Sequence, residues 1–401
     1  MARRLAWTFV LLACTLVAPP AGAQREPRVI AIGDIHGDLV SFREILRSAR
    51  LIDAHGGWAG GRDILVQTGD FTDRGSEVRG VLDMLMRLER EAERAGGKVI
   101  TLLGNHEVMN LIGIWRDVTP EICAAFAGST STALRESAER AYEMLAARRG
   151  PLRPEAAAYR LSPDAWIASI PVGCLEYRDA MGPDGVYGRW LRDKPVVTTV
   201  GAVTFMHAGP RPAAAVERLN DLNNQVWEEI RKVDAFRARM VREGLALPAF
   251  DLSEMLNVFM TEARGVNAAL AAGRESGTPP DLRGWEVELL RDMATMVEID
   301  TWAVIDPEGP LWYRGWARPQ ADGVDAGIAA LDRWGVRRFV VAHTVNPDFR
   351  IAVHYGGRVI AIDTGMLTTT YGGRASALEV AGGAFTAVYV DGRTALGPRT
   401  D

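Results

Sequence analysis

The stretch that decides the fold reads Arg28-Val29-Ile30-Ala31-Ile32-Gly33-Asp34-Ile35-His36-Gly37. A short apolar run rich in β-branched residues ends abruptly in a polar cluster. Asp34 and His36 are two residues apart, so on an extended backbone their side chains point to one face. Gly33 and Gly37 allow the chain to turn tightly on either side of them. The stretch therefore predicts a buried strand whose carboxyl end presents a carboxylate and an imidazole together.

The same pattern occurs twice more downstream. Residues 63–67 lead into Thr68-Gly69-Asp70-Phe71-Thr72-Asp73-Arg74-Gly75, and residues 98–103 lead into Gly104-Asn105-His106-Glu107. Near-continuous apolar strands indicate burial on both faces of a sheet. Apolar residues at helical spacing lie between the strands, namely Leu39, Phe42, Ile45, Leu46 and Ala49 after Asp38, and Val78, Val81, Leu82, Leu85 and Leu88 after Ser76, the expected N-cap. Alternating strands and helices predict an α/β fold with parallel strands, whose carboxyl ends gather ligands.

Strands return in the second half of the chain and again end in histidine motifs. Residues 195–206 end at His207-Ala208-Gly209, and residues 338–341 end at Ala342-His343-Thr344. Gly356-Gly357 and Asp391-Gly392 are typical of hairpin turns. Two helical regions, about 115–170 and 213–305, interrupt this pattern without a linker, so we expect insertions into one domain over residues 24–401.

Composition excludes some classes of function. The chain has 401 residues, 48% of them apolar, and a net charge of −5. A protein that holds nucleic acid by charge needs a basic excess, so we expect no nucleic-acid partner. A single phosphorylated substrate needs only a few local arginines. The sequence does not predict an oligomeric state.

The first 23 residues have the pattern of a signal peptide. Met1-Ala2-Arg3-Arg4 is basic, residues 5–18 are almost wholly apolar, and Ala21-Gly22-Ala23 fits a cleavage site. The apolar run is short for a transmembrane span, and Pro19-Pro20 ends it. We expect export to the periplasm or the medium, without stable membrane insertion after cleavage. A retained anchor, or lipidation at Cys14 in a loose lipoprotein box, are the alternatives.

Two cysteines remain after cleavage, Cys123 and Cys174. An oxidising compartment would permit a bridge between them, and two buried thiols are the alternative, because sequence does not show whether their Cα atoms approach. No Cys/His pairs have the spacing of a structural zinc site.

Six side chains at the strand ends form a candidate metal-binding set: Asp34, His36, Asp70, Asn105, His207 and His343. Two carboxylates, three imidazoles and one amide, with no thiolate, suit Mn, Fe or Zn, and two ions rather than one. A shared carboxylate holds two divalent ions roughly 3.5–4 Å apart in sites for in-line phosphoryl displacement. We expect Asp70 to be that bridge.

This ordered set of motifs, which spans residues 33–344, resembles the metallophosphoesterase superfamily. The Asp73-Arg74-Gly75 and Gly104–Glu107 motifs are similar to its phosphoprotein phosphatase branch, and the bacterial Shewanella-like type is the closest match. The resemblance implies a metallo-dependent phosphatase fold, which is an α/β–β sandwich of two mixed sheets flanked by helices. The two helical insertions would then form a cap over the cleft.

The resemblance also implies roles for the metal ligands. Asp34, His36 and Asp70 would hold the first ion, with manganese foremost and iron or zinc as alternatives. The second ion would be held by Asp70, Asn105, His207 and His343. Ala208 and Ala342 stand where the family often has glycine, which removes no ligand but leaves the sub-branch open. A water activated by the two ions would be the nucleophile.

Four further residues would act on the substrate. His106 would protonate the leaving oxygen, Asp73 would orient and charge His106, and Arg74 would grip the phosphate. Arg314, in Leu311-Trp312-Tyr313-Arg314-Gly315, is the best match for a second phosphate-binding arginine. We expect Asp363 to support the site from a late strand.

The predicted function is hydrolysis of phosphate monoesters on a small molecule or a phosphoprotein, with preference for Ser/Thr or Tyr left open. A nucleotide or dinucleotide polyphosphate hydrolase is the alternative enzyme. An inactive phosphate-binding scaffold is the alternative of another class, and it would have lost a ligand or His106. Among the other motif residues, we expect Glu107 and His354 to be structural and His55 to lie on the surface.

Overall fold

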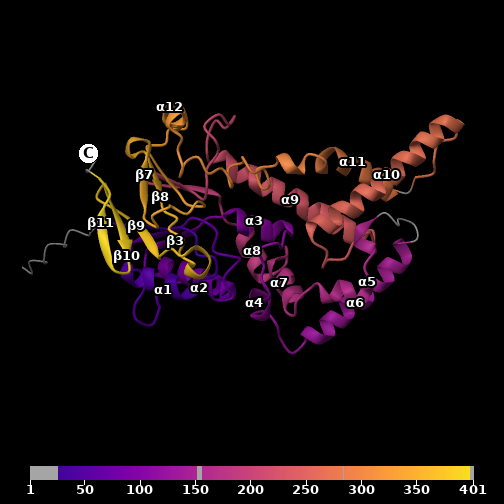
Figure 1. Cartoon of the computed structure of the whole chain (residues 1–401), viewed down its shortest axis with the longest axis horizontal. Helices are drawn as coiled ribbons and strands as arrows, with labels where there is room; N and C mark the ends of the chain where they lie inside the picture. Colours follow the sequence, from indigo (N-terminus) through magenta and orange to yellow (C-terminus); the bar gives the residue numbers. More distant parts are fainter. Residues whose placement is uncertain (1–25, 151–155, 283, 398–401) are drawn as a thin grey trace, which may run out of the picture.

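Two mixed β-sheets form the centre of the structure, a computed structural model that describes residues 26–150, 156–282 and 284–397 (Figure 1). The predicted signal peptide and Cys14 lie outside the described residues. In the part of the chain that the structure describes, no helix combines the length and the apolar character that a membrane crossing needs.

The first sheet has six strands in the order β11-β10-β9-β1-β2-β3. Its strands are β1 (Val29–Ile32), β2 (Ile64–Gln67), β3 (Lys98–Thr101), β9 (Ser376–Ala381), β10 (Ala384–Tyr389) and β11 (Gly392–Ala395). The strands β1, β2 and β3 are parallel, as their sequence pattern predicts, and the C-terminal strand β9 pairs antiparallel with β1. The two ends of the described chain therefore meet in one sheet.

The second sheet has five strands in the order β4-β5-β6-β8-β7. Its strands are β4 (Val197–Val200), β5 (Val203–Met206), β6 (Arg338–Val341), β7 (Ala352–His354) and β8 (Val359–Ala361). The central strands β5, β6 and β8 are parallel. The hairpin expected at Gly356-Gly357 joins β7 to β8, with a turn of 3₁₀ helix at Tyr355–Gly357.

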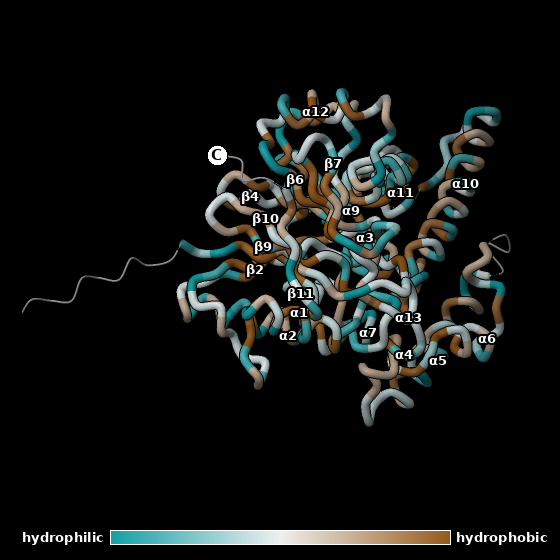
Figure 2. The backbone as a smooth tube through the Cα atoms, turned by 60° about the vertical axis from the view of Figure 1, so that its left-hand side comes forward, coloured by the Kyte–Doolittle hydropathy of each residue, from teal (hydrophilic) through white to brown (hydrophobic). Residues whose placement is uncertain are grey.

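The central strands are mainly apolar because both faces of each sheet are buried there. In β1, Ala31 packs in the core between the two sheets, whereas Ile30 and Ile32 pack in the core beneath the helices. In β6, Val340 faces the partner sheet and Phe339 faces the helices. Side chains alternate across a strand, so a strand covered on both sides reads as one apolar run. Figure 2 shows these apolar segments gathered at the centre of the molecule.

Helices cover the outer faces of the sheets. They are α1 (Leu39–Ser48), α2 (Val78–Arg94), α3 (Asn105–Ile112), α12 (Val324–Arg333) and α13 (Thr368–Tyr371). Asp38 caps α1, since its side chain accepts a hydrogen bond of 2.9 Å from the backbone N–H of Ser41. The expected Ser76 cap of α2 is wrong: the N-cap residue is Glu77, and no side chain bonds to the helix start.

The remaining helices lie in two long segments beside the sandwich, on the side away from β11 (Figure 1). The first holds α4 (Pro120–Ala124), α5 (Ser131–Arg149), α6 (Pro163–Ala168), α7 (Cys174–Met181) and α8 (Val186–Arg192). It continues past residue 170, where the sequence pattern placed its end. The second holds α9 (Asp221–Arg242), α10 (Leu252–Ser276) and α11 (Gly284–Met296). Three short 3₁₀ turns complete the described structure, at Ala157–Tyr159, Ile299–Thr301 and Ala321–Gly323.

A disulfide joins Cys123 of α4 to Cys174 of α7, with their Cα atoms 4.6 Å apart. The sequence left open whether these residues pair. Both cysteines are buried, and they lie 51 residues apart in the sequence, so the bond ties together two helices that are distant along the chain.

Candidate metal centre

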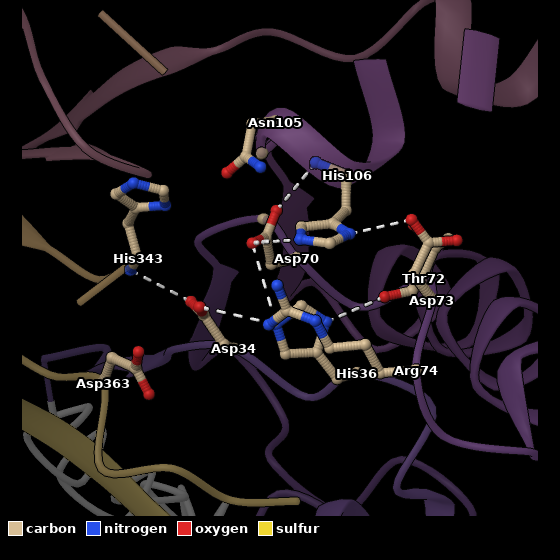
Figure 3. Close-up of polar contacts among 12 residues, drawn as sticks. Asp34, His36, Asp70, Thr72, Asp73, Arg74, Asn105, His106, His343 and Asp363 are labelled. Atoms are coloured by element: carbon tan, nitrogen blue, oxygen red, sulfur yellow. Dashed lines mark hydrogen bonds and ion pairs between the residues drawn. The ribbon is translucent and has the colours of Figure 1, made fainter. Parts of the chain in front are cut away.

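The six predicted donors come together at the carboxyl ends of the strands that precede them, and Figure 3 labels all of them except His207. Asp34 and His36 follow β1, Asp70 follows β2, and Asn105 follows β3 as the first residue of α3. His207 follows β5 and His343 follows β6, so the second sheet contributes these two imidazoles. All six side chains are buried. The two sheets therefore meet at one polar cluster in an apolar surround.

The tighter part of this cluster lies around His207. Its Nε2 atom is 3.2 Å from Oδ2 of Asp70, 2.9 Å from Oδ1 of Asn105 and 3.0 Å from Nδ1 of His343. These four side chains are the set predicted for the second ion. Their ligand atoms already converge within the space that one cation occupies.

The looser part lies around His36. Its Nε2 atom is 3.8 Å from both Oδ2 of Asp34 and Oδ2 of Asp70. Asp70 thus contacts both parts of the cluster through the same oxygen, as expected of a bridging carboxylate. The three side chains predicted for the first ion are brought together.

Backbone carbonyls fix the ring orientation of the three histidines. The contacts are His36 Nδ1 to the Thr72 carbonyl at 2.9 Å, His207 Nδ1 to the Thr68 carbonyl at 3.1 Å, and His343 Nε2 to the Trp312 carbonyl at 2.9 Å. A carbonyl only accepts, so each of these ring nitrogens carries the proton. The other nitrogen of each ring then presents a lone pair to the cluster, which is the form that binds a metal ion.

This arrangement fits a cation better than it fits the protein alone. Nε2 of His207 and Nδ1 of His343 face each other with their lone pairs at 3.0 Å, where no proton lies between them. Burial also favours the neutral imidazoles of His36 and His343. It lowers the pKa of His36 to about 3 and, with His207 and Arg314 nearby, lowers that of His343 well below its usual range.

The carboxylates point to the same conclusion. Burial, together with the neighbouring carboxylates of Asp363 and Asp70, raises the pKa of Asp34 well above its usual range. Asp363 is itself buried, and its Oδ2 atom has no hydrogen-bond partner among the described residues. Burial raises the pKa of Asp363 to about 6. Like charges held together in an apolar surround require a positive counter-charge, and the donor set supplies a place for divalent ions.

His106 differs from the three histidines of the predicted donor set because a carboxylate backs it. Its Nδ1 atom is 2.8 Å from Oδ2 of Asp73. Burial opposes protonation of His106, but the Asp70 and Asp73 carboxylates outweigh it and raise the pKa of the imidazole. Oδ1 of Asp73 accepts a 2.9 Å hydrogen bond from Asn110, whose own Oδ1 accepts one of 2.7 Å from the Tyr177 hydroxyl. The geometry suits an imidazole that carries and delivers a proton.

Two arginines border the cluster, as expected. Arg74 donates to Nε2 of His36 at 3.0 Å, and its side chain is 31% exposed, so it reaches the solvent side of the site. Arg314 donates to the His343 carbonyl at 3.0 Å and to the Thr344 hydroxyl at 3.2 Å. Burial lowers the pKa of Arg314 without neutralising it. Both cations stand where a bound anion would need them.

Glu107 shapes the loop that carries Asp70, in keeping with its expected structural role. Its two carboxylate oxygens accept hydrogen bonds from the backbone N–H groups of Gly104, Asp70, Phe71 and Thr72 and from the Thr72 hydroxyl. These bonds hold an unusual backbone. Left-handed φ angles occur at eight described non-glycine residues, and five of them belong to the site, namely His36, Asp70, Asp73, Arg74 and His343. Such conformations cost roughly 1–3 kcal/mol each and gather where function requires them.

Sequence reasoning missed two residues that touch the site. Asn110 lies one helical turn after His106 on α3, so the i, i+4 spacing could have revealed it. The Tyr371 ring of α13 packs against His36 at a tilt of 33°, with ring centroids 5.8 Å apart, and its centroid lies 5.5 Å from the Arg74 guanidinium carbon. No local pattern marks Tyr371, since it arrives from the far end of the sequence. The other two histidines lie apart from this cluster, His55 in an exposed loop and His354 in β7.

Comparison with known proteins agrees with this geometry. The profile of the family described as calcineurin-like phosphoesterase matches residues 27–240. Over 96 residues the chain is 51% identical to Shewanella-like protein phosphatase 2 of Arabidopsis thaliana, which covers 24% of this chain and 25% of that protein. Shewanella-like protein phosphatase 1 of Plasmodium berghei is 28% identical over 54% of this chain and 50% of its own length. The chain thus spans half or less of these two relatives.

Two longer matches extend the comparison. An uncharacterized protein of Schizosaccharomyces pombe is 28% identical over 88% of this chain and 76% of its own length. The structure of a cold-active protein-tyrosine phosphatase from a psychrophilic Shewanella species superposes with a TM-score of 0.53 and 21% identity, covering 92% of this chain and 80% of that one. The last match shows the same two-sheet fold. The predicted resemblance to the phosphoprotein phosphatase branch is confirmed. Because the family profile matches more than half of its residues, this chain belongs to the calcineurin-like phosphoesterase family of metal-dependent phosphoesterases.

Proposed function

We propose that the protein is a phosphomonoesterase that binds two divalent ions, manganese foremost and iron or zinc as alternatives, and acts on phosphoproteins. The observation that carries this proposal is the meeting of six oxygen and nitrogen donors around Asp70. Nε2 of His207 lies 3.2 Å from Oδ2 of Asp70, and Nε2 of His36 lies 3.8 Å from the same oxygen. A single carboxylate oxygen shared by two ligand sets is the arrangement that holds two ions side by side.

The residues of the site divide the chemistry between them. Divalent ions held by the six donors would supply positive charge for the phosphate oxygens and would lower the pKa of a water toward neutrality. Arg74 and Arg314 bind the remaining phosphate oxygens and orient the group for in-line attack. His106 gives its proton to the leaving oxygen, and Asp73 keeps that imidazole positioned and charged through the 2.8 Å bond to Nδ1. Every group needed for hydrolysis is present, which argues against an inactive scaffold.

Turnover of p-nitrophenyl phosphate tests the metal dependence. The purified protein is stripped with EDTA, reconstituted with Mn²⁺, Fe²⁺ or Zn²⁺, and assayed beside elemental analysis. We expect two ions per chain and activity only after reconstitution, with Mn²⁺ the most effective. Full activity in the stripped protein, or one ion per chain at saturation, would overturn the two-metal proposal.

A substrate panel tests the phosphoprotein assignment. Two curated relatives are named as protein phosphatases, and the Shewanella protein of similar fold is a protein-tyrosine phosphatase, which together support that substrate class. The reconstituted enzyme is offered phosphotyrosine and phosphoserine/threonine peptides, nucleoside triphosphates and a dinucleoside tetraphosphate. We expect the highest kcat/KM on a phosphopeptide. A higher kcat/KM on the nucleotides would replace this assignment by a nucleotide polyphosphate hydrolase.

We propose further that the protein is exported. The Cys123–Cys174 disulfide supports this, because such bonds persist in oxidising compartments, and so does the signal-like pattern of the first 23 residues. The full chain is expressed in a bacterium with two membranes, and the fractions are probed for the protein and its N-terminus. Periplasmic protein that begins after Ala23 is expected. Cytoplasmic protein that retains Met1 would contradict export.

A further inference from the structure

A large cavity lies among the helices beside the sandwich, and none of the six predicted metal donors lines it. Its volume is about 890 Å³, and its walls come from α3, α5, α7, α9 and the segment before α10. Cavities of roughly 300–1,000 Å³ are the size that holds small organic ligands. Neither the proposed chemistry nor the family resemblance uses this space.

Two buried arginines, Arg178 of α7 and Arg237 of α9, line the cavity. The Arg178 side chain donates to the Ala249 carbonyl, and Nη2 of Arg237 donates to the Phe250 carbonyl at 3.1 Å. Nη1 of Arg237 is buried and has no hydrogen-bond partner among the described residues. That atom packs on Gly113, where even an added Cβ would lie 2.4 Å from it. Within the described ranges, backbone carbonyls are therefore the hydrogen-bond partners of this pair of cations.

Carboxylates lie near these arginines and favour their charged forms, Glu254 and Asp251 for Arg178 and Asp234 and Asp251 for Arg237. Neither arginine forms an ion pair with a carboxylate in the described ranges. Asp234 pairs with Arg192, and Asp251 and Glu254 form the capping box of α10. One oxygen of Glu176 accepts from Ser131, and the other has no hydrogen-bond partner among the described residues. Burial lowers the pKa of Arg237 to about 10, so the guanidinium stays positive at neutral pH. A buried cation without a direct ion pair is costly, and an anion entering the cavity could contact these arginines directly and relieve that cost.

The rest of the wall is mainly apolar, with Leu111, Leu175, Met181, Val241 and Met255 among its residues. Asp179, Asp234 and Glu176 also border the space, so a dianion such as phosphate would meet negative charge there. A carboxylate carries one negative charge and matches the planar fork of a guanidinium. We propose that this cavity is an effector site for a monocarboxylate with an apolar body, whose occupancy is transmitted through α3 to His106.

The helix α3 supplies the connection. It begins with Asn105 and His106 in the metal centre and ends at Gly113, against which Arg237 packs. Its eight residues span about 12 Å. Asn110 lines the cavity and also donates to Oδ1 of Asp73 at 2.9 Å. A ligand that moves Asn110 would therefore shift the carboxylate that positions His106, so the effect should fall on kcat more than on KM.

Octanoate is the probe for binding, with acetate and 1-octanol as controls that lack the apolar body or the charge. Binding is measured by calorimetry on the metal-loaded enzyme. Tryptophan fluorescence is a second readout, because Trp115 lines the cavity. We expect one saturable site for octanoate and none for the controls. Vanadate, bound at the metal centre, should not displace octanoate. Displacement by vanadate, or equal binding of acetate, would overturn the proposal.

Variants locate the site. Arg237→Gln should weaken octanoate binding at least about tenfold, the equivalent of about 1.4 kcal/mol for one lost charge-assisted contact. Arg231→Gln, on an exposed position of the same helix, is the matched control and should bind as the parent does. Ala138→Trp fills the cavity from α5 and should abolish binding; circular dichroism and metal content check that both variants fold. Unchanged binding in Arg237→Gln and Ala138→Trp would refute the location.

Turnover tests the coupling, and this arm rests on the proposed phosphatase function. With p-nitrophenyl phosphate, saturating octanoate should change kcat in the parent enzyme at nearly constant KM, and should leave kcat of Arg237→Gln unchanged at the same concentration. An unaltered kcat in the octanoate-saturated parent would overturn the effector role. Because binding is measured by calorimetry, failure of the phosphatase assignment would be seen separately, as absence of turnover without octanoate.

Discussion

Nη1 of Arg74 lies 3.0 Å from Nε2 of His36, the ring nitrogen that faces the carboxylates of Asp34 and Asp70. The opposite nitrogen of that ring is held by the Thr72 carbonyl, so Nε2 has the lone pair and Arg74 is the donor. A ligand histidine cannot give the same lone pair to an arginine and to a metal ion. An ion bound by Nε2 of His36 would therefore displace the guanidinium, which in the proposed function would then bind the substrate phosphate.

Arg74→Ala should weaken binding of phosphate without emptying the metal site. Loss of charge-assisted hydrogen bonds worth about 1.5–3 kcal/mol predicts a roughly 10- to 100-fold rise in the inhibition constant of inorganic phosphate. Arg74→Lys should recover only part of the loss, because an ammonium does not reproduce the bidentate fork. Product inhibition and elemental analysis of the same samples check this. An inhibition constant equal to that of the parent would remove Arg74 from the phosphate site.

His106→Asn should slow turnover and keep the metals. The imidazole is the one histidine of the cluster backed by a carboxylate, at 2.8 Å from Asp73, so we assign it proton transfer and not ligation. Loss of acid catalysis predicts a fall in kcat of about 10²- to 10⁴-fold. The loss should be smaller for substrates with good leaving groups, which need less protonation. Metal content decides the case, since an emptied site in this variant would make His106 a ligand.

Asp70→Asn should abolish both metal occupancy and activity. The amide keeps the size of the side chain and an oxygen to accept the 3.0 Å hydrogen bond from the His106 backbone, but it removes the charge shared by the two ligand sets. The matched control is Asp53→Asn, an exposed carboxylate whose two backbone hydrogen bonds an asparagine also accepts. Elemental analysis of both variants after Mn²⁺ reconstitution is the measurement. Two ions retained in Asp70→Asn would disprove the bridging role.

Much of the metal centre was predictable because each ligand follows a strand. Asp34, Asp70 and Asn105 end three apolar runs, and parallel strands bring their carboxyl ends to one edge. Contacts between distant segments were not predictable in this way. Tyr371 reaches His36 from the last third of the chain, and no periodicity marks it. Pairing of the cysteines likewise depends on how α4 and α7 pack, which sequence spacing does not contain.

The helical segments were the least predictable part. The spacing of their apolar residues shows that these helices bury one face. It does not show which other helices they pack against, because many packing partners suit the same pattern. Arg178 and Arg237 line one cavity only because α7, α9 and the end of α3 meet there. The prediction that Ser76 caps α2 was wrong for a related reason. The N-cap is one residue later, at Glu77, and backbone hydrogen bonds hold the preceding loop without a side-chain cap. Backbone N–H of Gly75 bonds to the His36 carbonyl, and that of Glu77 bonds to the Gly37 carbonyl.

His354 should make the protein less stable in mild acid. Burial lowers the pKa of this side chain below its usual value of about 6.5, and its Nε2 atom has no hydrogen-bond partner among the described residues. Below that pH the unfolded chain takes up a proton that the folded chain resists, so stability falls as the pH drops toward the folded-state pKa. The Tm of His354→Gln should therefore fall less than the Tm of the parent when the pH is lowered from about 7 to about 5.

Thermal unfolding at matched metal content measures this difference. The metal ligands also titrate in acid, so the comparison is between variant and parent at each pH and not along one curve. His55→Gln, in an exposed loop, is the control and should follow the parent. Parallel curves for His354→Gln and the parent would show that another group causes the acid sensitivity.

Reduction of the Cys123–Cys174 bond should destabilise the fold. The bond closes a loop with a sequence separation of 51 residues, for which the chain-entropy relation predicts a loss of up to about 4 kcal/mol. Dithiothreitol should lower both the urea midpoint and the Tm of the parent. The double variant Cys123→Ala/Cys174→Ala should unfold at a similarly low midpoint and should not respond to dithiothreitol, which separates loss of the bond from any effect of the reductant on the metals. A parent that shows two free thiols after denaturation without reductant would disprove the bond, and with it one of the two supports for export.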